Sequence, residues 1–276
     1  MITHGWLKLI KQEGTVDVQE EIPGLIFLEA KPSYPVQTNN NVKMNGIDGE
    51  IPGAITYDPF NLVVKVGFDG VDVIDVDLLE EKLRGLFNTR QRYYVSTSQM
   101  PAKKYAVDNP VISAEYLGTS AVKFEITFNV YKGYSESLYK TDQFSLMSDK
   151  WQFEGGLIPD EEITFKHTRQ KFKIYNGSTD TINPRFHFLK IWIRCNTEKS
   201  FKIVNKTTGD IFEFKGTLKK NQSLVLDGVY PYLDLKRCGR LTNHGVISLA
   251  PGFNDFEVWG TLSNFEIEFV FNYIYR

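Results

Sequence analysis

The chain has 276 residues, which is enough for two domains of ordinary size, and 42% of its residues are hydrophobic and 14% aromatic. This composition excludes a disordered chain, because disorder requires far fewer large apolar side chains. The formal net charge of −2 argues against nonspecific binding to nucleic acids or membranes, since both require a basic surface.

The charge is unevenly distributed along the chain. Residues 1–142 contain 14 Lys and Arg against 19 Asp and Glu, a net charge of −5, whereas the remainder contains 18 against 15, a net charge of +3. No secretion signal is visible in Met1–Lys8, and no stretch approaches the roughly 20 apolar residues that span a bilayer. Cys195 and Cys238 have no CxxC spacing, so we expect buried free thiols, with one disulfide as the alternative.

Strands are predicted for most of the first half, where apolar and polar residues alternate with a period of two. The first long exception in chain order is Lys31–Gly53, which contains three prolines and three consecutive asparagines. Proline removes backbone hydrogen-bond donors, and asparagine favours turns over strand ladders. We therefore expect an exposed arm here, and the alternative is a mobile surface loop.

A single helix is predicted later in the first half, between clearly alternating segments at Leu62–Val66 and Phe124–Val130. The segment Asp77–Phe87 breaks the alternation and places its large apolar residues on one helical stripe. Asp77 and Glu80 are spaced as a capping pair at the helix start. The residues of the stripe are Leu78, Leu79, Leu83, Leu86 and Phe87.

The second half consists of short alternating segments separated by turn dipeptides, a pattern typical of a β-sandwich. The clearest segments are Phe172–Tyr175, Ile191–Ile193, Phe201–Ile203 and Phe265–Phe271. The predicted fold is therefore mainly β. An N-terminal domain, residues 1–140, is expected to be a β-sandwich or split-barrel-like domain with one α-helix. A C-terminal β-sandwich, residues 141–276, follows it.

Motifs that carry chemistry are absent from the sequence, which contains no Walker A loop, GxGxxG, HExxH or GxSxG. The segment Gly133–Ser137 comes nearest to the last motif but lacks its closing glycine. The acidic run Asp72–Glu81 lacks the alternating oxygen ligands of a calcium loop, and helix capping explains it better. The histidines, none of them at metal-ligand spacing, are His4, His167, His187 and His244. We expect no catalytic residues, no cofactor and no metal site.

Two features of the second half could bind a ligand. Its aromatic residues could supply platforms for stacking sugars, although aromatic residues of a sandwich more often lie in the core. The candidates are Trp151, Trp192, Trp259, Tyr230 and Tyr232. The segment Lys236–Arg240 forms a small basic patch, which we interpret as a solvated loop.

The order of motifs along nearly the whole chain resembles the distal tail proteins of long non-contractile-tailed phages, the siphophage tail family. In the first half, the turn segment Asn45–Gly49 precedes the strands, the lone helix, Tyr93–Val95 and Phe124–Val130, which runs into Tyr134–Ser137. The second half carries, in order, Tyr175–Thr179 with Pro184, Asn205–Asp210, Gly216–Leu218, Leu224–Gly228 and Leu249–Asn254.

This resemblance implies a structural virion protein at the distal end of a phage tail, made in the bacterial cytoplasm without a signal peptide. The N-terminal domain would form a homo-hexameric ring that continues the tail tube and contacts the tail tube protein and the tail-tip hub protein. The C-terminal domain would be a galectin-like sandwich to which receptor-binding proteins attach. DNA would pass through the ring without specific binding, and no membrane insertion is implied.

The residues agree with the resemblance in two respects. A ring through which DNA slides should not attract phosphate, and the net-acidic first part suits that requirement. A free edge strand or a projecting arm is what a ring subunit would use to pair with its neighbour, and we assign that role to Lys31–Gly53. Two alternatives stay open: a carbohydrate-binding, lectin-like protein acting through the C-terminal sandwich, and a glycan-cleaving tail enzyme.

Overall fold

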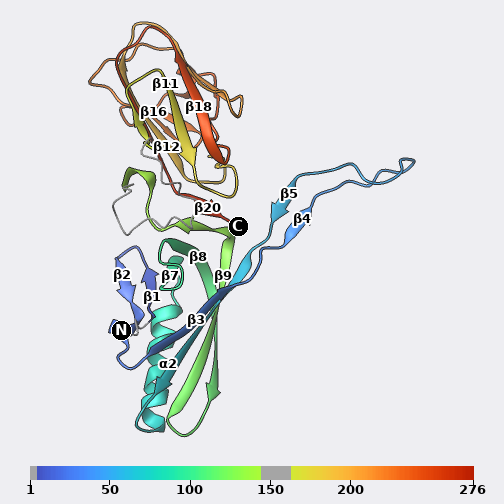
Figure 1. Cartoon of the computed structure of the whole chain (residues 1–276), viewed down its shortest axis with the longest axis vertical. Helices are drawn as coiled ribbons and strands as arrows, with labels where there is room; N and C mark the ends of the chain where they lie inside the picture. Colours follow the sequence, from blue (N-terminus) through green and yellow to red (C-terminus); the bar gives the residue numbers. More distant parts are fainter. Residues whose placement is uncertain (1–4, 144–162) are drawn as a thin grey trace. The chain divides into compact units, whose positions relative to one another are not determined.

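The computed structural model of the chain describes residues 5–143 and 163–276, which form two compact units. The first unit comprises the residues up to Glu136 together with Arg276, and the second comprises Ser137–Tyr275. Both consist mainly of β-sheet, so the predicted mainly β fold class is confirmed (Figure 1). Among these residues, no helix is long and apolar enough to cross a membrane.

The first unit is built on one sheet in the strand order β2-β1-β7-β8-β9-β6-β3. Its strands are β1 (Leu7–Ile10), β2 (Thr15–Asp17), β3 (Ile26–Pro32), β6 (Phe60–Asp69), β7 (Tyr93–Thr97), β8 (Lys103–Tyr116) and β9 (Ala121–Ser137). Because this path does not close on itself, β2 and β3 are its edge strands.

The pairing of β6 with β9 forms the centre of this sheet. The two strands run antiparallel in continuous register from Phe60 opposite Val130 to Asp69 opposite Ala121. Alternate residues point to the same face of a strand, so cross-strand pairs such as Leu62 with Phe128 bury their side chains together. The predicted alternation thus becomes one apolar face, which forms the core of the first unit.

The helix α2 (Val73–Phe87) packs on this apolar face. The Phe87 ring meets the Phe128 ring edge-on, with 5.7 Å between the ring centroids. The buried residues of the helix recur at helical spacing and are Val76, Leu79, Leu83 and Phe87. The predicted amphipathic helix is therefore confirmed, but its stripe is rotated, because Leu78 is 53% exposed.

The start of this helix differs from the prediction, which placed the capping pair at Asp77 and Glu80. The N-cap is Asp72, whose side chain accepts a hydrogen bond from the Asp75 backbone N–H at 3.1 Å. In return, the Asp75 carboxylate accepts one from the Val71 N–H at 2.8 Å. The predicted type of motif is present, but it lies five residues earlier.

A second, one-turn helix, α1 (Val18–Glu21), was not expected from the sequence. Its N-cap is Asp17, whose side chain accepts a hydrogen bond from the Gln19 N–H at 3.1 Å. The Gln19 side chain accepts another from the Leu7 N–H at 2.9 Å, which ties the turn to β1. Four residues are too few to show helical periodicity in a sequence.

The second unit contains a six-stranded sheet in the order β10-β19-β12-β15-β16-β17 and a four-stranded sheet in the order β11-β18-β13-β14. The six-stranded sheet comprises β10 (Lys166–His167), β12 (Leu189–Asn196), β15 (Leu224–Asp227), β16 (Tyr230–Leu233), β17 (Lys236–Arg237) and β19 (Ser263–Phe271). The four-stranded sheet comprises β11 (Lys171–Asn176), β13 (Phe201–Asn205), β14 (Ile211–Phe214) and β18 (Gly252–Trp259), and β20 (Ile274–Tyr275) follows both sheets in the chain.

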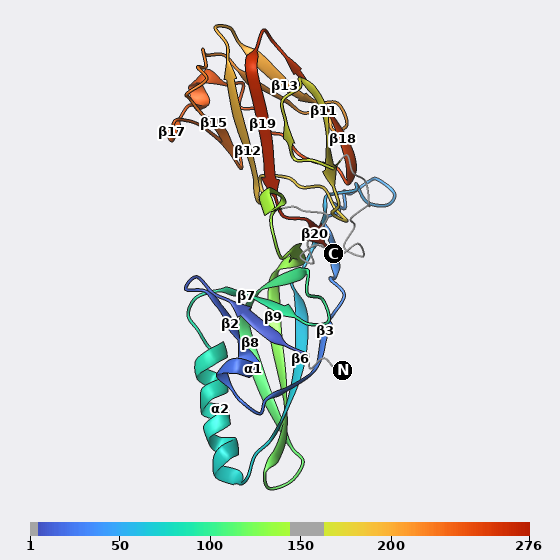
Figure 2. The same ribbon diagram turned by 60° about the vertical axis from the view of Figure 1, so that its left-hand side comes forward.

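These two sheets face each other (Figure 2), and aromatic side chains pack between them. The rings of Phe172 on β11 and Phe256 on β18 stack with 5.3 Å between their centroids. Phe269 on the opposite sheet lies 5.0 Å from Phe256, again between centroids. Alternating aromatic and polar residues therefore produce two half-buried sheets, the packing of a β-sandwich.

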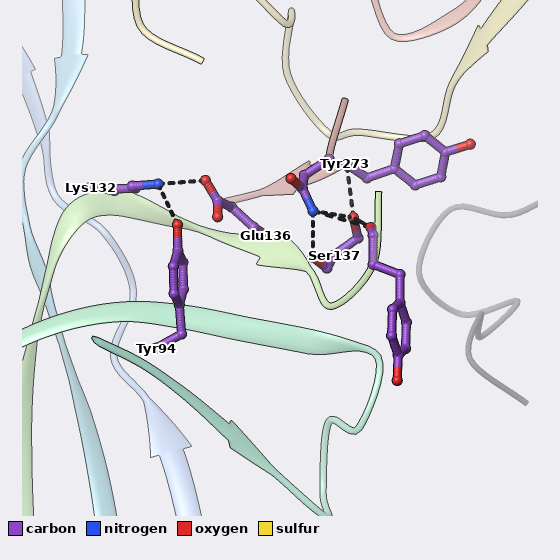
Figure 3. Close-up of polar contacts among 7 residues, drawn as sticks. Tyr94, Lys132, Glu136, Ser137 and Tyr273 are labelled. Atoms are coloured by element: carbon purple, nitrogen blue, oxygen red, sulfur yellow. Dashed lines mark hydrogen bonds and ion pairs between the residues drawn. The ribbon is translucent and has the colours of Figure 1, made fainter. Parts of the chain in front are cut away.

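Residues 137–141 are hydrogen-bonded to the C-terminal part of the same unit. The Thr141 hydroxyl donates to the Phe269 carbonyl at 2.8 Å and accepts from the Phe271 N–H at 3.1 Å. The Ser137 hydroxyl accepts from the Tyr273 N–H at 3.0 Å (Figure 3). These buried contacts join the two ends of the unit, so its independent stability should depend on where a fragment begins.

We expect residues 137–276 to fold alone with a cooperative thermal transition. A fragment that begins at residue 142 lacks both Thr141 and Ser137, which leaves the Phe269 carbonyl and the N–H groups of Phe271 and Tyr273 without these partners. That loss should cost about 2–3 kcal/mol and lower the melting temperature by several degrees. Calorimetry of the two fragments checks this, and equal melting temperatures, or a noncooperative transition of the longer one, would count against it.

A second prediction concerns the helix cap. Asp72→Ala removes the acceptor of the Asp75 N–H and should destabilise the chain by about 1 kcal/mol. Asp77→Ala, a matched change inside the helix, should alter stability by less than about 0.5 kcal/mol. Urea unfolding of both variants measures the difference, and a larger effect at Asp77 would show that the cap has been misassigned.

Candidate functional site

The segment between β3 and β6, residues 33–59, extends away from the sheet of the first unit as a long hairpin (Figure 1). We call it the arm. Its strands β4 (Gln37–Asn39) and β5 (Ile55–Tyr57) pair antiparallel, and a bridge joins Val42 to Ile51 nearer the tip. The predicted exposure of this segment is confirmed, whereas the expectation that asparagine would prevent a ladder is wrong.

The asparagines support the arm instead of interrupting it. The Asn40 side-chain amide donates to the Ala54 carbonyl at 2.8 Å, beside the backbone bond from Asn40 N to the same oxygen. The Asn41 side-chain oxygen accepts from the Gly53 N–H at 3.0 Å. The strands come so close that a Cβ on Gly53 would lie 1.7 Å from the Asn40 carbonyl oxygen, so only glycine fits there.

The arm exposes seven large apolar side chains that it cannot bury itself. Tyr34 is 94% exposed, although it is one of the largest apolar residues in the segment. The others are Val36, Val42, Met44, Ile47, Ile51 and Ile55. A two-stranded ribbon is only marginally stable in water, and clustered exposed apolar residues usually mark an interaction surface.

The edge strand β3 extends this surface to the base of the arm. Ile26 and Leu28 point outward and are about half exposed, and a β-bulge interrupts the pairing between Phe27 and Glu29. An edge strand offers unpaired backbone groups to another chain, and apolar side chains along it strengthen such pairing. The arm and β3 together form what we call the assembly surface.

A half-buried polar cluster of residues from β9 and β7 has the residue types of a reactive site but the geometry of a structural one. The Lys132 ammonium lies 2.7 Å from a Glu136 carboxylate oxygen and 3.0 Å from the Tyr94 hydroxyl (Figure 3). Burial, the largest single effect, lowers the pKa of Lys132, but the charge of Glu136 and the hydrogen bonds to Glu136 and Tyr94 together outweigh it, so the pKa is raised overall. Burial, followed by Glu136, raises the pKa of Tyr94. Lys132 therefore stays protonated and is unsuited to act as a nucleophile or base.

The residues considered for metal or redox chemistry do not gather in the described part of the chain. No group of three or more His, Cys, Asp or Glu there is arranged to hold a metal ion. Cys195 and Cys238 are both buried and free, as predicted. Burial raises the pKa of the Cys195 thiol to about 11, which makes it unreactive near neutral pH. His4 lies outside the described residues.

The aromatic candidates for sugar stacking lie on both sheets of the second unit. Trp259 is 49% exposed on the outer face of β18, in the four-stranded sheet. Trp192 and Tyr232 share the outer face of the other sheet, where both are paired with Val225 on the strand between them. The described candidates therefore do not form a single platform for stacking sugars. Trp151 lies outside the described residues.

The comparisons with known proteins agree with this architecture. Residues 13–130 match the family model of the phage tail protein RIFT-related domain. The crystal structure of the Dit protein (gp 19.1) of phage SPP1 matches with a TM-score of 0.69, at 12% identity, over 99% of each chain. Two structures of the activated phage P2 baseplate, with calcium and with strontium, give TM-scores of 0.42 and 0.41 at 13% identity over 98% and 97% of both chains. No curated protein matches at the level of sequence.

These matches confirm the resemblance to siphophage distal tail proteins that the sequence predicted. At 12% identity, the likeness to the SPP1 protein shows a shared fold over the whole chain. That protein is described as a paradigm of the hub adsorption apparatus in phages that infect Gram-positive bacteria. Residues 13–130 thus carry a domain of the phage tail type, and the whole chain shares its fold with the SPP1 protein.

The close approach of Gly53 to the Asn40 carbonyl oxygen leads to a prediction about the stability of the arm ladder. Gly53→Ala should force the two arm strands apart and increase the hydrogen-exchange rate of the Asn40 amide roughly tenfold. The melting temperature should change little, because the arm lies outside the core. Gly118→Ala, at a glycine with open space around it, is the matched control. Unchanged exchange in Gly53→Ala would mean that the ladder does not exist in solution.

Proposed function

We propose that this chain is the distal tail hub of a long-tailed phage, a structural protein whose first unit assembles into a closed ring of six copies. The ring would join the tail tube to the tail-tip or baseplate proteins, and the second unit, a galectin-like sandwich, would attach receptor-binding proteins. Residues 1–140 and 141–276 are the proposed limits of these domains. The family match and the fold shared with the SPP1 hub protein support this role.

The assembly surface is the observation that carries the proposal. A stable interface buries about 1,200–2,000 Å² in total, and an edge strand as short as β3 does not supply that area alone. The arm adds seven large apolar side chains, all of them exposed in the single chain. An arm that lies across the next subunit would bury them and complete the interface.

A contact between an arm and a different surface of the neighbour is heterologous, which means that the two faces are not the same patch. Such contacts generate rings when the rotation between subunits closes, and filaments when it does not. The free edges β2 and β3 lie at opposite ends of the strand order and give each subunit two different faces. The first unit therefore has the parts that a cyclic assembly requires.

The charge of the first part of the chain suits a channel for DNA. Its net charge of −5 comes from 14 Lys and Arg against 19 Asp and Glu in residues 1–142. A lumen that binds phosphate would retain the genome during ejection, whereas an acidic one allows it to slide. In this role the protein lies at the distal end of the tail in the virion. The role requires no enzymatic step, no cofactor and no insertion into a membrane.

Replacement of residues 37–56 by a short Gly-Ser linker tests the proposal. The wild-type chain at high concentration should have the mass of six copies in light scattering. The armless variant should dissociate at a concentration at least tenfold higher, because the apolar side chains of the arm no longer contribute to the interface. Its thermal unfolding as a monomer should match that of wild type, which serves as the folding control. A wild-type chain that stays monomeric, or a ring unaffected by loss of the arm, would contradict the proposal.

A further inference from the structure

The hairpin between β16 and β17 has a strained residue at its tip. Its two turn residues, Asp234 and Leu235, have positive φ angles of 46° and 67°, the conformation of a turn that favours Asn-Gly. Asp234 tolerates this, because its carboxylate accepts hydrogen bonds from the Ser223 N–H and the Gln222 side chain, both at 3.0 Å. Leu235 gains no such bond and is 90% exposed.

A leucine in this position disfavours folding, because its side chain clashes with the backbone when φ is positive. Its apolar surface stays in water, so no burial offsets this strain. Glycine would remove the strain. Strained residues of this kind persist where they serve a function, and an apolar side chain held at the tip of a rigid turn is suited to enter a pocket on a partner.

The positive charge beside this leucine is not neutralised within the described chain. Lys236, Arg237 and Arg240 are exposed, and none of them forms an ion pair with a described carboxylate. Arg237 instead lies over the Tyr230 ring, 4.4 Å from its centroid. Some other cations of this unit are paired, as where Lys171 lies 3.1 Å from Glu257 and Lys190 lies 3.0 Å from Asp227.

An open groove of about 940 Å³ runs beside the hairpin. Its lining combines the three cations with Leu233 and Leu241, and the latter is 41% exposed. Its acidic member, Asp234, already accepts the two hydrogen bonds described above. β17 is the last strand of its sheet, so one backbone edge at the groove has no strand partner in the described chain.

We propose that this groove is a docking site for an extended, acidic and partly apolar segment of another protein. Acidic side chains of the segment would pair with Lys236 and Arg240, while its apolar side chains would contact Leu241 in the groove lining and Leu235 on the hairpin tip next to the groove. A purely anionic polymer, such as a phosphate-rich cell-wall chain, would satisfy the cations but would leave both leucines in water. This inference rests on the proposed role of the second unit in attaching other proteins, and it adds the surface and the chemistry of the partner. Because the groove belongs to the second unit alone, it requires no ring, so its test can fail while the ring is confirmed, and the reverse.

The probe for a direct test is a fluorescent 12-residue peptide of alternating Asp and Leu, measured by fluorescence anisotropy with the full chain. Binding should weaken as salt is added, because the cations are exposed. Lys236→Glu combined with Arg240→Glu should raise Kd roughly tenfold or more. The matched control, Lys199→Glu combined with Lys220→Glu, reverses two exposed lysines outside the groove and should leave Kd unchanged.

Leu235→Gly separates function from stability. The substitution should raise the melting temperature by about 2–4 °C, since glycine accepts the positive φ. The same variant should bind the Asp-Leu peptide roughly tenfold more weakly, because the apolar contact is lost. A residue that served only the fold would not show these opposite effects.

Three outcomes would overturn the proposal. The first is the absence of peptide binding at low salt, and the second is an unchanged Kd in the charge-reversed groove variant. The third is equal affinity for an Asp-Ser peptide or for inorganic polyphosphate, which would show that the groove attracts any polyanion. Tighter binding of the Asp-Leu peptide than of either of these supports the site.

Discussion

The antiparallel ladder between β6 and β9 is the interaction on which the first unit depends. Its register, which places Leu62 opposite Phe128, creates the apolar face that helix α2 covers. The same strand β6 begins where the arm ends, so the ladder also fixes the base of the arm. A slip of one residue would turn the buried side chains toward solvent and remove the support for both elements.

The covered face of the sheet contrasts with its open edges. Burial is nearly complete on the helix side, whereas Ile26, Leu28 and the apolar side chains of the arm stay in water. Ordering a ribbon of this length costs conformational entropy, which the hydrogen bonds of Asn40 and Asn41 offset only in part. A partner surface that buries the apolar side chains of the arm would offset the rest of this entropy cost. The proposed partner is a second copy of the chain.

Much of the fold could be predicted from the sequence, because strict alternation leaves little choice of secondary structure. The helix start could not, since apolar and acidic residues are interspersed in Val71–Asp77 without a clear helical stripe, so the capping pair of Asp72 and Asp75 did not stand out. The ladder of the arm escaped prediction because the bonds of its asparagines join residues more than ten positions apart. The basic patch at Lys236–Arg240 was visible in the sequence, but the strained Leu235 beside it required backbone angles.

Electron cryomicroscopy of the assembled wild-type chain tests the central claim most directly. The account predicts a closed ring with six-fold symmetry, in which each arm lies along the adjacent subunit and the exposed fraction of Tyr34 falls well below its value of 94% in the single chain. An assembly without rotational symmetry, or a ring whose arms extend into solvent and contact no neighbour, would contradict it.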